Sequence, residues 1–413
     1  MRKIIAIVLC LVMALGLVAC SEPAANNEGD GEQEVKKLAF KDVIGTELGA
    51  VHVDTEGVDY SGMKIGFIHI SDPSDMGYTY NHNNGTLKMV ETLGLDADTQ
   101  IINKFNIAED NAEVTQAANE LIAEGCNLIF ATSFGHEPAL LEVAKANPDV
   151  QFCHATGYMA STAGVSNFHN YFGRIYEARY LSGVVAGLKA KEIGNNRLGY
   201  VAAVPFAEVI SGFTSFYLGA KSVNPDVTMK VMYTGSWNDP TKEAQNANAL
   251  IDAGCGVISQ HCDSTAPATA AEEKGAFHVG YNSGMIDVAP NASLTSTIWD
   301  WSQYLVYATT CVAKGDPIDT DWMGGLYDGV CLLSDLNENL LAEGTADAVK
   351  TAYNGILDGS IHVFAGPYHG EGVDFDGNTV TIDVAEGEWY EENEFVSAPS
   401  FNYIIDGIEV VGE

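Results

Sequence analysis

The chain of 413 residues is strongly acidic, with 20 Lys and Arg residues against 56 Asp and Glu residues and a formal net charge of −36 at pH 7. Its 46% hydrophobic and 18% charged residues are typical of a globular protein, which excludes a disordered chain, a collagen-like repeat and a heptad-rich rod. Nucleic-acid binding is excluded because it requires clustered Lys and Arg, and the same negative charge disfavours broad contact with an anionic lipid surface. At about 150 residues per domain, the length predicts two domains or lobes.

The N-terminus has the pattern of a secretory signal. A positively charged start, Met1-Arg2-Lys3, precedes residues 4–18, which are almost wholly apolar but shorter than the ~20 residues of a spanning helix. The following Ala19-Cys20 resembles the end of the lipobox of bacterial lipoproteins, where signal removal leaves a Cys that carries a diacylglycerol. We therefore expect a signal peptide over 1–19, a lipid on Cys20, and an acidic tether over 20–60 on the extracytoplasmic face of a cell membrane. An ordinary signal peptide with an incidental Cys is the alternative.

Short apolar runs alternate with longer helical patterns from residue 63 onward. The first half predicts a helix from the turn after residue 70 to about 93, helices over 110–124 and 136–146, and strands over 63–70, 100–105, 127–131 and 151–155. Strand–helix alternation at this spacing is typical of βαβ units and of a mostly parallel sheet.

The same pattern restarts in the second half. It predicts helices over 176–190, 208–222, about 240–252 and 266–274, strands over 197–204, 227–233, 256–260 and 277–280, and a later helix over 301–313. We therefore expect an α/β protein with two doubly wound lobes joined by a hinge. The expected boundaries are 61–168 plus about 292–325 for the N-terminal lobe, 169–291 plus about 326–365 for the C-terminal lobe, and 366–413 for a β-rich closing segment.

The loops that follow strands are the expected place for a ligand, because ligands of open parallel sheets bind beyond the carboxyl ends of the strands. These loops are 71–81, 132–136, 205–206, 235–239, 260–264 and 281–285. They are rich in aromatic, Asn, Asp, Gln and Ser side chains and poor in Lys and Arg. Such a cleft suits a flat, polar, largely uncharged ligand, with rings stacking on its faces and polar groups contacting its edges.

Motifs for covalent, phosphate or metal chemistry are absent from the sequence. It contains no GxSxG, GxxxxGK[ST], GxGxxG or HExxH pattern, and no Cys spacing typical of zinc. The tripeptide His261-Cys262-Asp263 contains metal-ligating side chain types, but an ordinary strand-end loop is the favoured interpretation. Buried free thiols are favoured for the later cysteines, and a pairing of Cys255 with Cys262 stays open. No cofactor, metal or catalytic residue is expected.

Several stretches together resemble the basic membrane protein family of ABC-transporter substrate-binding lipoproteins, which is related to bacterial purine nucleoside receptors. They are 64–70 with 75–82, 127–135 with 144–152, 173–183, 280–283, 299–301 and 364–367. The resemblance covers most of the chain after about residue 60. It implies a type I periplasmic-binding-protein fold, two lobes that close on a ligand, and delivery of that ligand to a permease in the membrane. Members of this family commonly bind purine bases or nucleosides.

The resemblance also implies ligand-binding residues in the loops between the lobes. It places Tyr78 and Tyr80 where a ring stacks on the base, Asp75 in the same loop, and Phe206 where the second lobe offers the opposing ring. Packing inside the protein is the alternative for each ring, and Trp237 is a further ring candidate. The other expected ligand-binding residues are Asn81, Phe134, Asp263 and Asn282; turn formation is the alternative for the last two.

One position departs from the family pattern. Gly284 stands where nucleoside receptors often have an Asp that grips the ribose hydroxyls, which favours a free base or another small aromatic polar ligand. The sequence thus predicts a lipid-anchored substrate-binding protein that captures a purine base or nucleoside without covalent chemistry. The alternatives are a ligand-sensing surface lipoprotein without a transporter and, less favoured, a nucleoside-hydrolysing enzyme.

Overall fold

The computed structural model of the chain describes residues 35–373 and 377–412. The expected signal peptide, the expected lipid on Cys20 and residues 20–34 of the expected tether lie outside the described residues. None of the described helices is long and apolar enough to cross a membrane.

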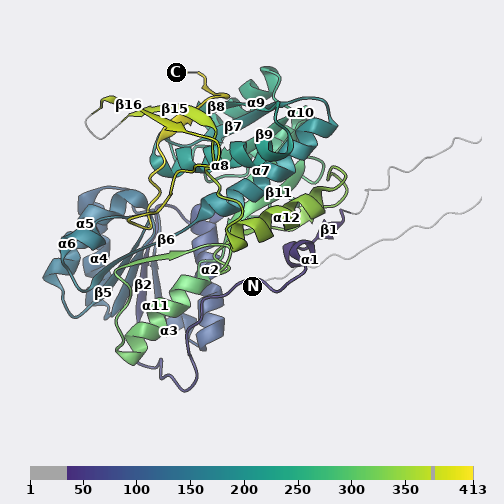
Figure 1. Cartoon of the computed structure of the whole chain (residues 1–413). Helices are drawn as coiled ribbons and strands as arrows, with labels where there is room; N and C mark the ends of the chain where they lie inside the picture. Colours follow the sequence, from purple (N-terminus) through teal and green to yellow (C-terminus); the bar gives the residue numbers. More distant parts are fainter. Residues whose placement is uncertain (1–34, 374–376, 413) are drawn as a thin grey trace, which may run out of the picture. The chain divides into compact units, whose positions relative to one another are not determined.

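The N-terminal lobe is built on a six-stranded, fully parallel sheet with the strand order β12-β6-β5-β4-β2-β3. Its strands are β2 (Ile65–Ile68), β3 (Ile101–Lys104), β4 (Leu128–Ala131), β5 (Gln151–Ala155), β6 (Phe168–Gly173) and β12 (Asp321–Gly324). Its helical segments are η1 (Pro73–Asp75), α2 (Tyr78–Leu93), α3 (Ala97–Gln100), α4 (Asn111–Ala123), η2 (Phe134–His136), α5 (Glu137–Ala146), α6 (Ala160–Ala163) and α11 (Ser302–Lys314). Figure 1 shows α4 and α5 on one side of the strands and α2 and α11 on the other, which is a doubly wound arrangement.

The C-terminal lobe has a seven-stranded sheet with the order β13-β11-β10-β9-β7-β8-β18, in which only β13 is antiparallel to its neighbour. Its strands are β7 (Arg197–Ala202), β8 (Thr228–Tyr233), β9 (Val257–His261), β10 (Phe277–Asn282), β11 (Ser293–Trp299), β13 (Cys331–Leu333) and β18 (Ile408–Val410). Its helices are α7 (Ile175–Glu192), α8 (Ala207–Val223), α9 (Pro240–Asp252), α10 (Ala266–Lys274) and α12 (Thr345–Asp358). Apolar residues of α7 and α8 cover one face of this sheet, and those of α9 and α10 cover the other.

Helices α7 and α8 pack closely because glycines face backbone at their contact. A Cβ atom on Gly183 would lie 2.0 Å from the carbonyl oxygen of Phe216, and one on Gly219 would lie 2.0 Å from that of Tyr180. The small residues seen in the sequence of α7 therefore have a direct steric reason, and the close contact fixes the two helices as one layer.

The C-terminal segment forms an antiparallel sheet of β15 (Tyr368–Val373), β16 (Thr379–Val384) and β17 (Tyr403–Ile405) before β18 joins the C-terminal lobe. It lies beside the C-terminal lobe in Figure 1. Near the other end of the described chain, β1 (Lys37–Leu38) pairs with β14 (Leu336–Asn337), and α1 (Phe40–Ile44) packs against α12.

Three segment boundaries differ from the expected ones. Strand β6 continues the N-terminal sheet to Gly173, beyond the boundary at 168, and β11 belongs to the C-terminal sheet instead of the N-terminal lobe. Both strands adjoin crossovers between the lobes, where an apolar run does not reveal which sheet it joins. Residues 37–44 are not part of a tether, because Phe40, Val43 and Ile44 are buried. Their i, i+3, i+4 spacing is that of an amphipathic helix.

Candidate functional site

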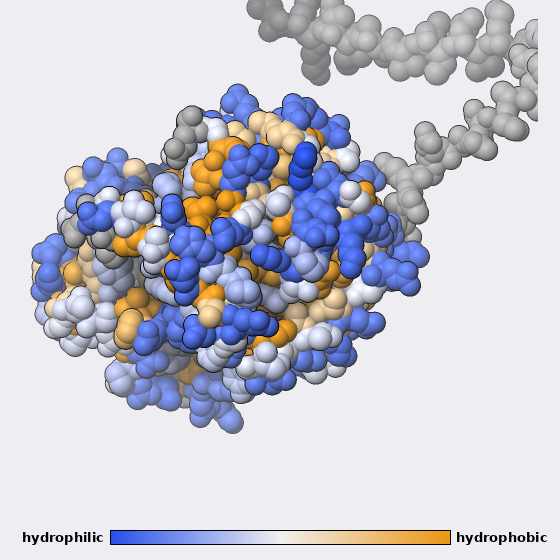
Figure 2. Space-filling view, turned by 45° about the horizontal axis from the view of Figure 1, so that its top comes forward, coloured by the Kyte–Doolittle hydropathy of each residue, from blue (hydrophilic) through white to orange (hydrophobic). Residues whose placement is uncertain are grey.

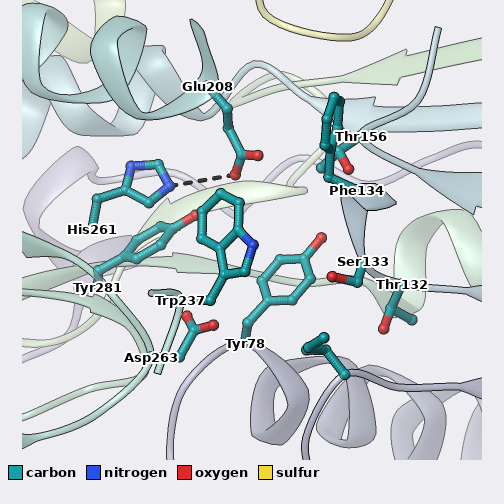
Figure 3. Close-up of a pocket in the computed structure, with 11 residues that line it drawn as sticks. Tyr78, Thr132, Ser133, Phe134, Thr156, Glu208, Trp237, His261, Asp263 and Tyr281 are labelled. Carbon is teal, nitrogen blue, oxygen red and sulfur yellow. Dashed lines mark hydrogen bonds and ion pairs between the residues drawn. The ribbon is translucent and has the colours of Figure 1, made fainter. Parts of the chain in front are cut away.

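A pocket lies between the carboxyl ends of the two parallel sheets (Figure 3). The empty space among its lining residues, counted together with the open solvent at its mouth, is about 360 Å³. The N-terminal lobe contributes Ile70, Tyr78, Thr132, Ser133, Phe134 and Thr156, and the C-terminal lobe contributes Glu208, Trp237, His261, Asp263 and Tyr281. These residues end a strand or lie in the loop or helix start after it, which is the ligand position typical of open α/β sheets.

Aromatic side chains from both lobes form much of the pocket lining. Tyr78 packs edge-on against the buried ring of His82, with ring centroids 4.6 Å apart, and its buried hydroxyl has no hydrogen-bond partner among the described residues. The ring centroids of Phe134 and Phe206 lie 5.5 Å apart across the gap between the lobes, and those of Phe206 and Trp237 lie 6.1 Å apart. The rings of Phe134, Phe206 and Trp237 therefore form one row of contacts that spans the two lobes, and Tyr78 adds a separate ring from α2.

A carboxylate–imidazole pair occupies the C-terminal side of the pocket. Nε2 of His261 lies 3.3 Å from Oε1 of Glu208, as Figure 3 shows. Burial raises the pKa of Glu208 to about 7, against the opposing effect of the nearby Arg179 guanidinium. Burial and the same guanidinium hold the pKa of His261 well below its usual value. The imidazole is therefore neutral near pH 7, and when Glu208 is ionised the contact requires the tautomer in which Nε2–H donates to Oε1.

Arg179 places a fixed positive charge behind this pair. It is fully buried, donates from one guanidinium nitrogen to the carbonyl oxygen of Gln260 at 2.8 Å, and lies 3.7 Å from the centroid of the Tyr281 ring. The cation–π contact fixes the orientation of Tyr281, and the positive charge partly offsets the cost of burying Glu208.

Direct contacts join the first turn of α2, and Gly77 just before it, to the C-terminal lobe. Nδ2 of Asn81 donates to the carbonyl oxygen of Asn282 at 2.7 Å, and Nδ2 of Asn282 donates to Oδ1 of Asp263, also at 2.7 Å. A Cβ atom on Gly77 would lie 2.7 Å from Cα of Asp263, so this approach of the lobes requires a glycine. These contacts describe a closed arrangement in which one Asp263 oxygen is already paired.

Eight of the nine expected ligand-binding residues lie in three environments. Tyr78, Phe134, Trp237 and Asp263 line the pocket, and Phe206 contacts two of these rings while remaining 43% exposed. Asn81 and Asn282 form the contact between the lobes instead of lining the pocket. Tyr80 is half-buried on α2 and is also absent from the lining.

Asp75 does not line the pocket either. Its Oδ1 accepts from the backbone N–H groups of Gly77 and Tyr80 at 2.9 and 3.0 Å, and its Oδ2 accepts from Thr79 at 3.1 Å. Helix N-termini have unpaired N–H groups that a carboxylate satisfies well, and this backbone position explains the acidic residue. Gly284 is not among the lining residues, and a Cβ atom added there would lie 3.5 Å from Cβ of Ser334.

The sequence pattern pointed to neither Glu208 nor Tyr281, and it pointed to His261 only as a side chain of metal-ligating type. His261 and Tyr281 fall inside the loops 260–264 and 281–285 that were expected to contact a ligand, and Thr132 and Ser133 fall inside 132–136. Glu208 is the second residue of α8 and follows the loop 205–206. Position after a strand was thus a usable signal, but the sequence does not reveal which side chains turn inward.

The described residues contain no group of three or more His, Cys, Asp and Glu side chains arranged to hold a metal ion. Cys255 and Cys262 are both buried free thiols, which closes the question of their pairing. Two parallel sheets that face each other across a ring-lined pocket, with crossovers between them, define the class of two-lobed solute-binding proteins.

Comparison with known proteins gives the family. Residues 63–361 match the family described as "Bmp: ABC transporter substrate-binding protein PnrA-like", and the chain belongs to this family. It is 36% identical over 324 residues to a purine-binding protein of Brucella abortus, covering 77% of this chain and 86% of that protein. It is 33% identical over 339 residues to a putative ABC transporter glucose-binding protein of Haloferax volcanii, covering 80% and 83%.

A solved structure supports the same fold. An ABC transporter solute-binding protein from Aeropyrum pernix K1 superposes with a TM-score of 0.62 at 20% identity, covering 76% of this chain and 95% of that one. The expected family and the expected two-lobed binding-protein fold are therefore confirmed. The protein is an extracytoplasmic substrate-binding protein of an ABC transporter.

Proposed function

We propose that this protein captures a purine base or nucleoside between its lobes and delivers it to the permease of an ABC importer. The observation that carries the proposal is the pocket itself, where Tyr78, Phe134 and Trp237 surround a few buried polar groups. A flat heteroaromatic ring fits such a lining, because its faces contact the rings while its edge nitrogens and oxygens contact hydroxyls and carboxylates. The Brucella relative is named as a purine-binding protein, which supports the same solute class.

The binding energy comes from contacts that both lobes make with one ligand. A base stacked on an aromatic side chain gains about 1–3 kcal/mol. Because the ring surfaces belong to different lobes, such contacts are complete only when the lobes are closed. Ligand binding therefore shifts the protein toward the closed state, and that state presents the surface that a permease recognises.

The membrane attachment in this proposal depends on Cys20. A diacylglycerol on this Cys, with each buried CH₂ worth about 0.8 kcal/mol, would hold the protein at the cell membrane near its permease. Figure 2 shows mostly hydrophilic side chains on the face that it presents. In a chain of net charge −36, such a surface favours solubility and steers a basic docking partner.

A sugar is the second candidate solute, because the Haloferax relative is named as a putative glucose-binding protein. Carboxylates and aromatic rings also bind sugars, so the pocket chemistry alone does not separate the two. A role in ligand sensing without a transporter is less favoured, because the family is described as ABC transporter substrate-binding proteins. A nucleoside-hydrolysing enzyme is disfavoured, since the relatives are named as binding proteins.

The test measures ligand binding by isothermal titration calorimetry on protein freed of bound solute by unfolding and refolding. The panel contains adenine, guanine, hypoxanthine, their nucleosides and glucose. We expect micromolar or tighter binding of at least one purine, and weaker binding by Trp237→Ala. Phe395→Ala is the matched control, since Phe395 is 84% exposed and outside the pocket. Binding of glucose without any purine would replace the proposed solute class.

A further inference from the structure

Glu208 presents one unused carboxylate oxygen to the pocket. Its Oε1 contacts His261, whereas Oε2 makes no hydrogen bond to any described residue. The residue lies in the first turn of α8, and Figure 3 shows its carboxylate directed toward the space between Trp237, Tyr78 and Phe134. The side chain is 12% exposed, so this oxygen is open to the pocket and can accept a hydrogen bond from a ligand in place of water.

The charges around the pocket favour a ligand that donates hydrogen bonds. Its described lining includes two carboxylates, Glu208 and Asp263, and no Lys or Arg. The buried Arg179 lies behind Tyr281 and is outside the lining. Burial and the neighbouring acidic groups raise the pKa of Asp263, which disfavours its charged form. An anionic ligand would meet no positive charge in this lining, while the N–H groups of a neutral ring meet acceptor oxygens.

The two carboxylates are not equivalent. Asp263 already accepts from Nδ2 of Asn282, which itself takes part in the contact between the lobes. Glu208 accepts only from a neutral imidazole at the longer distance of 3.3 Å. Its second oxygen is thus the stronger candidate for direct recognition of a ligand edge.

We propose that Glu208 is a specificity-determining residue whose Oε2 accepts an N–H of the ligand. It selects, among purines, a neutral base that carries a ring N–H or an exocyclic amine on the edge facing α8. This inference rests on the proposed function, because it assumes that a purine occupies the pocket. His261 acts as a positioning residue that holds the carboxylate in one orientation.

The variant Glu208→Gln separates recognition from structure. Glutamine keeps the size of the side chain and can still offer its carbonyl oxygen to Nε2–H of His261. It replaces the free oxygen with an NH₂ group, which faces the ligand N–H as donor against donor. A purely structural role survives this change, whereas a recognition role does not.

The experiment combines this variant with N-methylated ligands in calorimetric titrations. The tightest-binding purine of the panel is compared with analogues in which each N–H is replaced in turn by N–CH₃. We expect Glu208→Gln to weaken the parent purine by about 10- to 100-fold, the loss typical of a hydrogen bond to a charged group. One methylated analogue should bind the wild type more weakly than the parent purine does, by a similar factor. Glu208→Gln should weaken the binding of that analogue by less than a further threefold.

The control is Glu273→Gln, an exposed carboxylate on α10 of the same lobe. It should bind every ligand as the wild type does, and thermal melts should show that both variants are folded. If the wild type binds a purine and Glu208→Gln binds it equally well, this inference fails while the proposed function stands. If the wild type binds no purine, the proposed function and the inference fall together.

Discussion

Replacing Glu208 by Gln should make the ligand-free protein more stable at high pH. Burial raises the pKa of Glu208 from its usual 4.5 to about 7. The folded state therefore holds a proton that the unfolded state releases, and the free energy of unfolding falls as the pH rises from about 4.5 to 7. At 1.36 kcal/mol per pKa unit, the full effect is about 3 kcal/mol, of which about 2.5 kcal/mol falls between pH 5 and pH 8. Gln does not titrate and escapes this loss.

The assay is urea unfolding of the wild type and of Glu208→Gln at pH 5 and pH 8, with Glu343→Gln as an exposed control. Other buried carboxyls with raised pKa values, such as Asp75 and Glu137, are common to all three proteins and cancel in the comparison. The difference in unfolding free energy between Glu208→Gln and the wild type should move by about 2.5 kcal/mol in favour of the variant. A movement below about 0.5 kcal/mol, equal to that of the control, would show that the carboxyl is not buried as described.

Three further outcomes follow from contacts described above. Binding of an N–H donor to the ionised Glu208 should weaken about tenfold per pH unit below pH 7, measured by calorimetry, and a flat profile in the wild type would contradict this role. Asn81→Ala should shift the equilibrium between open and closed lobes by about fivefold toward the open state, because one neutral hydrogen bond between the lobes is lost. Small-angle scattering should report larger dimensions for the variant, and equal dimensions would refute this prediction. Gly183→Ala should lower the free energy of unfolding by about 1–3 kcal/mol, because the new Cβ meets the Phe216 carbonyl, whereas Gly62→Ala, with no atom within 4 Å, should leave it unchanged in urea titrations.

The strands were predictable because strands buried on both faces consist of continuous apolar runs. The segment 63–70 contains β2, whose four residues are all buried, and 127–131 contains β4 in the same way. Loops after such strands identify the region of the pocket, since parallel strands end at a common edge. Trp237 lies in such a loop and lines the pocket, whereas Tyr78, which also lines it, was expected from the family resemblance.

What the sequence could not supply is the direction of individual side chains. Asp75 and Asp263 are both acidic loop residues. The carboxylate of Asp75 accepts hydrogen bonds from backbone N–H groups, whereas Asp263 lines the pocket. The pairing of Glu208 with His261 joins α8 to the end of β9, and their separation of 53 residues leaves no local pattern. Tertiary packing decides such contacts, which explains why the polar interior of the pocket was missed.

The position of Trp237 gives the protein an internal optical reporter. Of the five tryptophans, Trp237 lines the pocket, while Trp299, Trp301 and Trp322 are buried and Trp389 is stacked on His362. Arrival of an aromatic solute should therefore alter the emission of Trp237 most directly, because it is the one tryptophan among the described lining residues. Intrinsic fluorescence then allows the rate of capture to be followed in real time, without any label.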